Sequence, residues 1–91
     1  MASIRIPTPL RTYTKGLDEV RVAGRTVGEA IGALSSSYDG IGSRILEGDG
    51  KVRRFVNLYV NDKDIRSLKG LDTEIRDSDV LAIVPAIAGG R

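Results

Sequence analysis

The 91-residue sequence contains no cysteine and no histidine. The absence of cysteine excludes disulfide bonds, thiol nucleophiles and zinc–thiolate sites. The absence of histidine removes the most common general base and the most common metal ligand of proteins. Carboxylates, lysines, tyrosines and hydroxyl groups are the side chains left for chemistry, so the composition argues against an autonomous enzyme in so small a chain.

The sequence also lacks an excess of charge of one sign and any long apolar run. Its 14 basic and 12 acidic residues are interspersed and give a net charge of +2. Nucleic-acid binding needs a concentrated basic face, and the densest basic run, Lys51 with Arg53 and Arg54, is typical of a solvated loop. No apolar run approaches the roughly 20 residues that span a bilayer, and no signal-peptide pattern is present. We therefore expect a cytoplasmic protein without nucleic-acid or membrane partners.

The pattern of apolar residues predicts one small α+β domain. The chain is 41% hydrophobic and 29% charged, which is ordinary for a soluble globular protein. Alternation predicts strands over residues 3–6 and 17–22, paired as an opening hairpin, and further strands over residues 55–60 and 80–84. Short turns of helix are expected within residues 41–46 and 68–75. One helix across one face of a single sheet accommodates this order of elements.

The clearest local pattern is that of a helix beginning after Thr26. Thr26 and Glu29 form a capping box, in which the hydroxyl accepts from the amide of residue 29 and the carboxylate accepts from the amide of residue 26. The helix should end near the serines at 35–37. Its apolar stripe consists of Val27, Ala30, Ile31, Leu34 and Tyr38.

The two C-terminal strands are apolar in both alternation phases. If the helix covers one face of the sheet, the other face keeps apolar side chains in contact with water, and such a patch usually marks a docking surface. There are two alternatives. In the first, the exposed residues are those of the opposite alternation phase of each strand. In the second, a loop over residues 41–53 folds across this face. The candidate docking residues are Phe55, Tyr59, Leu81 and Ile83.

The chain ends in Gly89-Gly90-Arg91, after the apolar run 79–85 and the short extension 86–88. Glycine has no Cβ, so two consecutive glycines can pass through a channel that rejects side chains. We interpret residues 86–91 as a tail that delivers its terminal carboxylate into another protein's site. The alternative is a frayed C-terminus with incidental glycines. Arg91 argues against a tail that is ready for this role, because the terminal carboxylate belongs to Arg91 and not to a glycine.

Several stretches resemble the ThiS/MoaD group of ubiquitin-like sulfur carriers. They are Arg-Phe-Val-Asn-Leu-Tyr-Val-Asn-Asp at 54–62, Asp-Ile-Arg at 64–66, and Val-Pro-Ala-Ile-Ala-Gly-Gly at 84–90. The resemblance covers nearly the whole chain. It implies a β-grasp fold over residues 1–85, with a mixed sheet of four to five strands and one main helix on one face, followed by a flexible tail.

The resemblance also implies how the tail is used. An activating enzyme of the ubiquitin-activating type would use ATP to adenylate the carboxylate of Gly90, and a sulfur donor would displace AMP to leave a thiocarboxylate. Ile87, Ala88 and Gly89 would thread through the partner's channel. The carrier itself would bind no cofactor. A biosynthetic enzyme would accept the sulfur, for cysteine first, as the Ile-Pro-Thr opening at residues 6–8 suggests, or for molybdopterin.

Arg91 departs from this pattern and leaves three explanations. The explanation that we favour is removal by a protease, with a metal-dependent isopeptidase-type protease as the analogue. Arg91 is otherwise a residue added to the natural chain, or the protein is no longer activated. Two further functions remain open beside the carrier: a ubiquitin-like modifier joined to lysines, and a small subunit of molybdopterin synthase.

Overall fold

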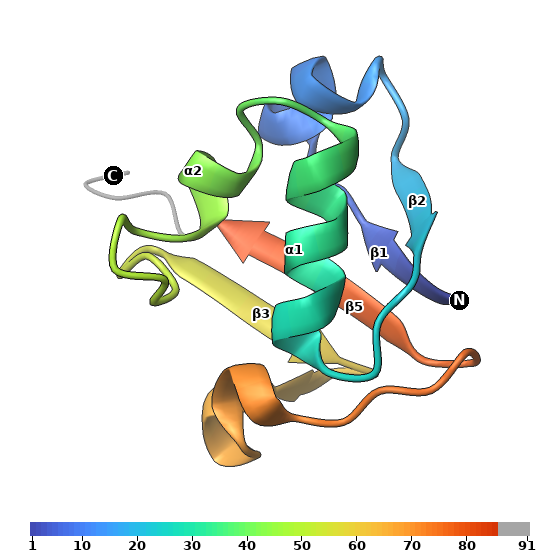
Figure 1. Cartoon of the computed structure of the whole chain (residues 1–91), viewed down its shortest axis with the longest axis vertical. Coiled ribbons are helices and arrows are strands. Elements are labelled where there is room, and N and C mark those ends of the chain that lie inside the picture. The colour runs from blue at the N-terminus through green and yellow to red at the C-terminus, as the bar shows by residue number, and fades with distance from the viewer. Residues whose placement is uncertain (86–91) are drawn as a thin grey trace.

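The computed structural model describes residues 1–85, which form a five-stranded mixed sheet in the order β2-β1-β5-β3-β4. The main helix, α1 (Val27–Ser37), crosses one face of this sheet (Figure 1). This arrangement confirms the predicted α+β class. The strands are β1 (Ala2–Arg5), β2 (Glu19–Val22), β3 (Val56–Val60), β4 (Lys63–Asp64) and β5 (Val80–Pro85), and the shorter helices are η1 (Thr8–Thr14), α2 (Gly42–Ile45), η2 (Ile65–Ser67) and η3 (Gly70–Asp72).

The predicted opening hairpin is present, with a longer connection than a simple turn. β1 and β2 pair antiparallel, with Ala2 opposite Val22. The 3-10 helix η1 fills the connection and carries Pro9 in its first turn, where proline suits a helix start because its φ is fixed and it has no N–H to leave unpaired. Buried Thr14 closes the segment by donating its hydroxyl to the carbonyl oxygen of Leu17 at 2.8 Å.

The capping of α1 follows the prediction at one of its two bonds. The Thr26 hydroxyl accepts from the amide of Glu29 at 3.2 Å, as expected. The Glu29 carboxylate accepts from the amide of Arg25 at 2.9 Å, one residue before the predicted donor. Residues before the helix are held extended against another segment, since the carbonyl oxygen of Arg25 accepts from the amide of Ile75 at 2.9 Å. This contact places the amide of Arg25, rather than that of Thr26, within reach of the carboxylate.

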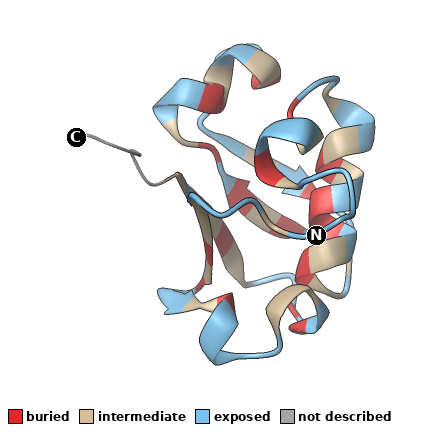
Figure 2. Ribbon diagram, turned by 90° about the vertical axis from the view of Figure 1, so that its left-hand side faces the viewer, coloured by how far each residue is buried: buried red, intermediate tan, exposed pale blue. Residues whose placement is uncertain are grey.

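The core lies between α1 and the facing side of the sheet, where Figure 2 shows the buried residues. Four of the five predicted stripe residues of α1 are buried, and Tyr38 is half-buried. Close packing of apolar side chains removes their surface from water, which stabilises the fold by roughly 25 cal/mol per Å². The facing residues from the strands include Ile4, Leu58, Leu81 and Ile83, each at most 3% exposed.

The register of β3 and β5 corrects half of the predicted docking surface. Leu58 lies opposite Ile83, and Val60 lies opposite Leu81. Because side chains of opposed residues point to the same face, all four lie under α1. Leu81 is 1% exposed and Ile83 is 3% exposed, so the prediction that these two are docking residues is wrong.

The segment 41–53 does not cover the opposite face. Its helix α2 lies beside α1 on the same side of the sheet (Figure 1). Ile41 and Ile45 are completely buried in the core. The loop alternative for this face is therefore wrong, whereas the predicted turn of helix within 41–46 is confirmed.

The stretch between β3 and β5 is compact and irregular. β4 is only 2 residues long, and η2 and η3 follow it, the second confirming the helical turn expected within residues 68–75. In residues 1–85, no helix has the length and apolar character needed to cross a membrane.

Candidate functional site

Strand β5 is the last element that the structure describes, and the predicted tail follows it in the sequence. It pairs in parallel with β1 and antiparallel with β3, so its backbone is held from both sides. Two hydrogen bonds of the Asn61 side chain hold the start of the strand: its amide donates to Asp79 at 2.7 Å, and its oxygen accepts from the backbone amide of Val80 at 3.0 Å. The strand ends at Pro85, which lies opposite Val56. The first half of β5, up to Ala82, thus has a strand on both sides, and the last residues before the end of the strand are paired with β3 alone.

The predicted tail residues lie beyond this point. Ile87, Ala88, Gly89, Gly90 and Arg91 lie outside the described residues. Their predicted roles in threading, activation and processing therefore stay predictions.

Exposed apolar side chains lie beside the end of β5, on the face of the sheet that α1 does not cover. Val84 is 42% exposed and lies opposite Asn57. Phe55, immediately before β3, is 52% exposed, and Tyr59 is half-buried. Figure 2 shows α1 on one side of the sheet only. Phe55 and Tyr59 thus remain candidate docking residues, and Val84 joins them in place of the buried pair.

Sequence reasoning left Val84 in the alternative phase of this strand, because both phases of β5 are apolar. Val80, Ala82 and Val84 alternate with buried Leu81 and Ile83, and both sets suit a strand equally well. The signal that separates them is the pairing with β3, where polar Asn57 lies opposite Val84.

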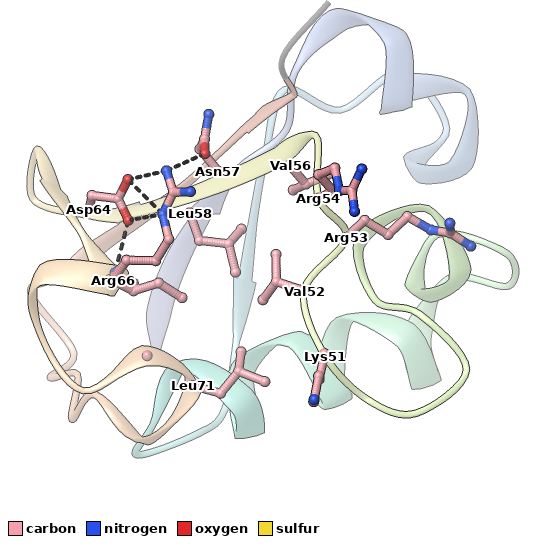
Figure 3. Close-up of a pocket in the computed structure, with 12 residues that line it drawn as sticks. Lys51, Val52, Arg53, Arg54, Val56, Asn57, Leu58, Asp64, Arg66 and Leu71 are labelled. Carbon is pink, nitrogen blue, oxygen red and sulfur yellow. Dashed lines mark hydrogen bonds and ion pairs between the residues drawn. The ribbon is translucent and has the colours of Figure 1, made fainter. Parts of the chain in front are cut away.

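A cleft of about 400 Å³ opens at the β3–β4 side of the domain (Figure 3). Three segments form it: residues 51–58, residues 64–66 and residues 70–71. Its apolar lining comes from Val52, Val56, Leu58, Ile65 and Leu71, and its basic lining from Lys51, Arg53, Arg54 and Arg66.

Arg66 is held in place at one edge of this cleft. Its guanidinium donates to the Asp64 carboxylate at 2.8 Å and to the Asn57 side-chain oxygen at 2.7 Å (Figure 3). The hydrogen bonds from Arg66 hold the pKa of Asp64 below its ordinary value, and the same partnership raises the pKa of Arg66. Sequence analysis identified only the basic run at residues 51–54. The other sides of the cleft come from residues 64–66 and 70–71, which only the folded chain brings next to this run.

Across residues 1–85, no three side chains of the metal-binding types gather as a cation site would require. The acidic residues beside β5 act on the backbone instead. Asp79 accepts from the amide of Arg76 at 2.8 Å and from Asn61, and these bonds, the first being the larger cause, lower its pKa.

A family model for the ThiS family matches residues 4–90. The chain belongs to the ThiS family. This membership confirms the resemblance to ThiS/MoaD-type carriers. The match ends at Gly90 and leaves Arg91 outside it.

Relatives of this ThiS-family chain agree in sequence and in fold. It is 46% identical over 90 residues to the sulfur carrier protein CysO of Mycobacterium tuberculosis strain H37Rv, with 97% of each chain covered. It is 37% identical over 65 residues to small archaeal modifier protein 3 of Haloferax volcanii, covering 71% of this chain and 70% of that protein. In the crystal structure of the BexX/CysO complex of Amycolatopsis orientalis, one chain is 44% identical and superposes with a TM-score of 0.92, covering 99% of this chain and 100% of the other.

The structural agreement confirms the β-grasp fold, with a mixed five-stranded sheet and one main helix on one face. The curated relatives are named as carriers and modifiers. The prediction that this ThiS-family chain is a carrier protein rather than an enzyme is thereby confirmed.

Proposed function

We propose that this protein carries sulfur for cysteine biosynthesis on the C-terminal carboxylate of Gly90. One observation carries the proposal: the chain is 46% identical to a protein named as the sulfur carrier CysO across 97% of both chains. The extent of the family match, which ends at Gly90, supports this residue as the functional terminus.

The chemistry requires a partner enzyme and no catalytic side chain on the carrier. An oxygen of the Gly90 carboxylate attacks the α-phosphate of ATP, so that an acyl-adenylate forms and pyrophosphate leaves. A hydrosulfide-type donor then attacks the carbonyl carbon and AMP departs, which leaves a thiocarboxylate. No electrons are transferred when the donor is at the oxidation level of sulfide. ATP is therefore a substrate of the activating enzyme and not a cofactor of this chain.

The geometry supports different roles for strand β5, which is part of the sheet, and for residues 86–90, which would extend into the partner's site. β5 is paired with β1 up to Ala82 and with β3 up to Pro85, so a partner that binds the domain also positions the end of this strand. From there, an extended peptide advances about 3.3 Å per residue, and the five residues from 86 to 90 would reach roughly 16 Å. Exposed Phe55 and Val84, with Tyr59, offer the apolar contact area beside the end of this strand.

Arg91 must be removed before activation under this proposal. As long as the terminal carboxylate belongs to Arg91, the carbonyl of Gly90 is part of a peptide bond and cannot be adenylated. We assign the removal to a processing protease, with a metal-dependent isopeptidase type as the analogue. The activating enzyme, this protease and the sulfur-accepting enzyme are the three partners implied.

A second function has one specific observation in its favour. The similarity to small archaeal modifier protein 3 supports a ubiquitin-like modifier, in which the same adenylate of Gly90 is passed to lysines of other proteins. The two functions share the first step and differ in the acceptor. Lysine-linked conjugates in cell extract would favour the modifier, whereas a free thiocarboxylate would favour the carrier.

Three chain lengths test the assignment of Gly90. Chains of residues 1–91, 1–90 and 1–89 are offered to the ubiquitin-activating-type enzyme of the same organism, and ATP–pyrophosphate exchange is measured. Only the 1–90 chain should support exchange; the 1–89 chain also ends in glycine and so controls for the length of the tail. Exchange with the 1–91 chain at the rate of the 1–90 chain, or no exchange with the 1–90 chain, would contradict the proposal.

A further inference from the structure

The cleft beside β3 has an apolar floor that can bind a side chain. Its volume of about 400 Å³ lies within the range of small-molecule and side-chain binding pockets. The innermost parts of the floor, Leu58 and Ile65, are buried, while Val52, Val56 and Leu71 are half-buried and remain accessible from the cleft. An apolar group that entered would remove these exposed surfaces from water.

The rim of the cleft is strongly cationic. Lys51, Arg53 and Arg54 come from one side of the cleft, with the Arg53 guanidinium directed away from the floor, and Arg66 lies on the other side (Figure 3). Asp64 is the only carboxylate among the lining residues, and it is already engaged by Arg66.

The basic side of the rim is left without carboxylate partners. Within residues 1–85 the two ion pairs are Met1 with Asp77 and Arg66 with Asp64, so none involves residues 51–54. Glu47 lies near Arg53 and Arg54, in a neighbouring hollow, without forming an ion pair. Arg53 is partly engaged, since its Nε donates to the carbonyl oxygen of Ser43 at 2.6 Å. Lys51 and Arg54 are exposed and are the cations most available to a ligand.

The cleft adjoins the point where the chain leaves the sheet. Val56 lines the cleft and lies opposite Pro85, the last residue of β5. A protein that held the residues after Pro85 would therefore have its own surface next to the cleft.

From the apolar floor, the unpaired cations and this position, we propose that the cleft binds an acidic segment of a partner protein. The segment inserts one apolar side chain onto the floor and places carboxylates against Lys51 and Arg54. The placement of this partner at the exit rests on the proposed function, whereas the binding chemistry of the cleft does not.

Other classes of occupant match the cleft less well. The lining contains no aromatic side chain, so it lacks the stacking platform typical of sites for single-stranded nucleic acid. A small inorganic anion would leave the apolar floor in contact with water. A protein segment with mixed apolar and acidic side chains uses both halves of the site.

The test is an NMR titration of the ¹⁵N-labelled full chain with a defined peptide, acetyl-Glu-Glu-Leu-Glu-Glu-amide. We expect saturable shifts of amides within residues 51–58 and 64–71, weakening with added salt. The same peptide with glutamine in place of glutamate should bind about tenfold more weakly, because several exposed ion pairs are lost. Arg54→Glu should abolish the shifts, and Lys51→Glu serves as a second variant. Arg25→Glu, which reverses an exposed arginine outside the cleft, should leave them unchanged.

Three results would overturn the proposal: equal binding of the two peptides, shifts confined to other residues, or binding unaffected by both charge reversals at the cleft. Titrations with inorganic phosphate and with octanoate complete the experiment. If either shifts the cleft amides while the acidic peptide does not, the cleft is a small-molecule site and the proposal is wrong. A chain of residues 1–90 that is adenylated normally and yet ignores the acidic peptide would refute the cleft proposal alone and leave the proposed function standing.

Discussion

Two substitutions in β5, three positions apart, should have very different effects on stability. Leu81 is 1% exposed and lies opposite Ile4 in β1 and Val60 in β3. Truncation of Leu81 to alanine leaves a cavity under α1, and such changes cost about 2–5 kcal/mol. Val84 is 42% exposed on the uncovered face, so Val84→Ala removes little buried surface and should cost less than about 1 kcal/mol.

The two costs are easily separated by thermal unfolding. For a domain of this size, 1 kcal/mol corresponds to roughly 4–8 °C in Tm. The same factor applies to both variants, so Leu81→Ala should lower Tm by at least about 8 °C and by at least about twice as much as Val84→Ala. Circular dichroism melts and urea titrations would measure both, with an unchanged urea m-value as the control for two-state unfolding. Equal losses, or a larger loss for Val84→Ala, would show that the two faces of β5 are assigned the wrong way round.

Three further changes test the N-cap of α1, the close approach of Gly42 to Ser35, and the loss of stability at acidic pH. Thr26→Ala should lose about 1 kcal/mol of unfolding free energy in urea titrations because the amide of Glu29 loses its cap, whereas Thr26→Ser should retain most of it; equal losses would refute the cap. Gly42→Ala should destabilise despite alanine's helix propensity, because its Cβ would collide with the side chain of Ser35, and Ser35→Ala should restore part of the Tm; a stabilised Gly42→Ala would contradict this packing. Because the pKa of Asp79 is lower when folded than its ordinary 3.8, its stabilising contribution is full above that pH and disappears as the pH falls through the folded pKa. Asp79→Asn should thus be less stable at pH 7 and should lose less stability on acidification than the parent; parallel pH curves would contradict this role.

The elements with strong local signals could be predicted from the sequence. Thr26 and the apolar stripe that begins at Val27 define α1, because a cap and a helical period both act within a few residues. The strand over residues 56–60 was predictable for the same reason, since β-branched and aromatic residues suit a pleated surface. The family resemblance rested on the C-terminal glycines together with the stretches at 54–62 and 64–66, and the glycines lie outside the described residues.

Features that depend on contacts between distant segments could not be predicted. Leu81 and Val84 are both apolar strand residues, and only the pairing of β5 with β3 decides which lies under the helix. The shift of the Glu29 bond to Arg25 depends on the contact between residue 25 and residue 75. The cleft also depends on tertiary structure, because its walls come from three separate segments. Local patterns predict elements, and tertiary pairing decides which of their faces is exposed.

The most direct test of sulfur carriage is the intact mass of the protein isolated from its own host. We expect a species lighter by one arginine residue in which sulfur replaces one oxygen, and fragmentation should place that sulfur on Gly90. Treatment with an alkylating reagent should modify this species at its C-terminus alone, since the chain has no cysteine to compete. Protein that retains Arg91 in every fraction and shows no sulfur-containing form, even when sulfur demand is high, would contradict the carrier function.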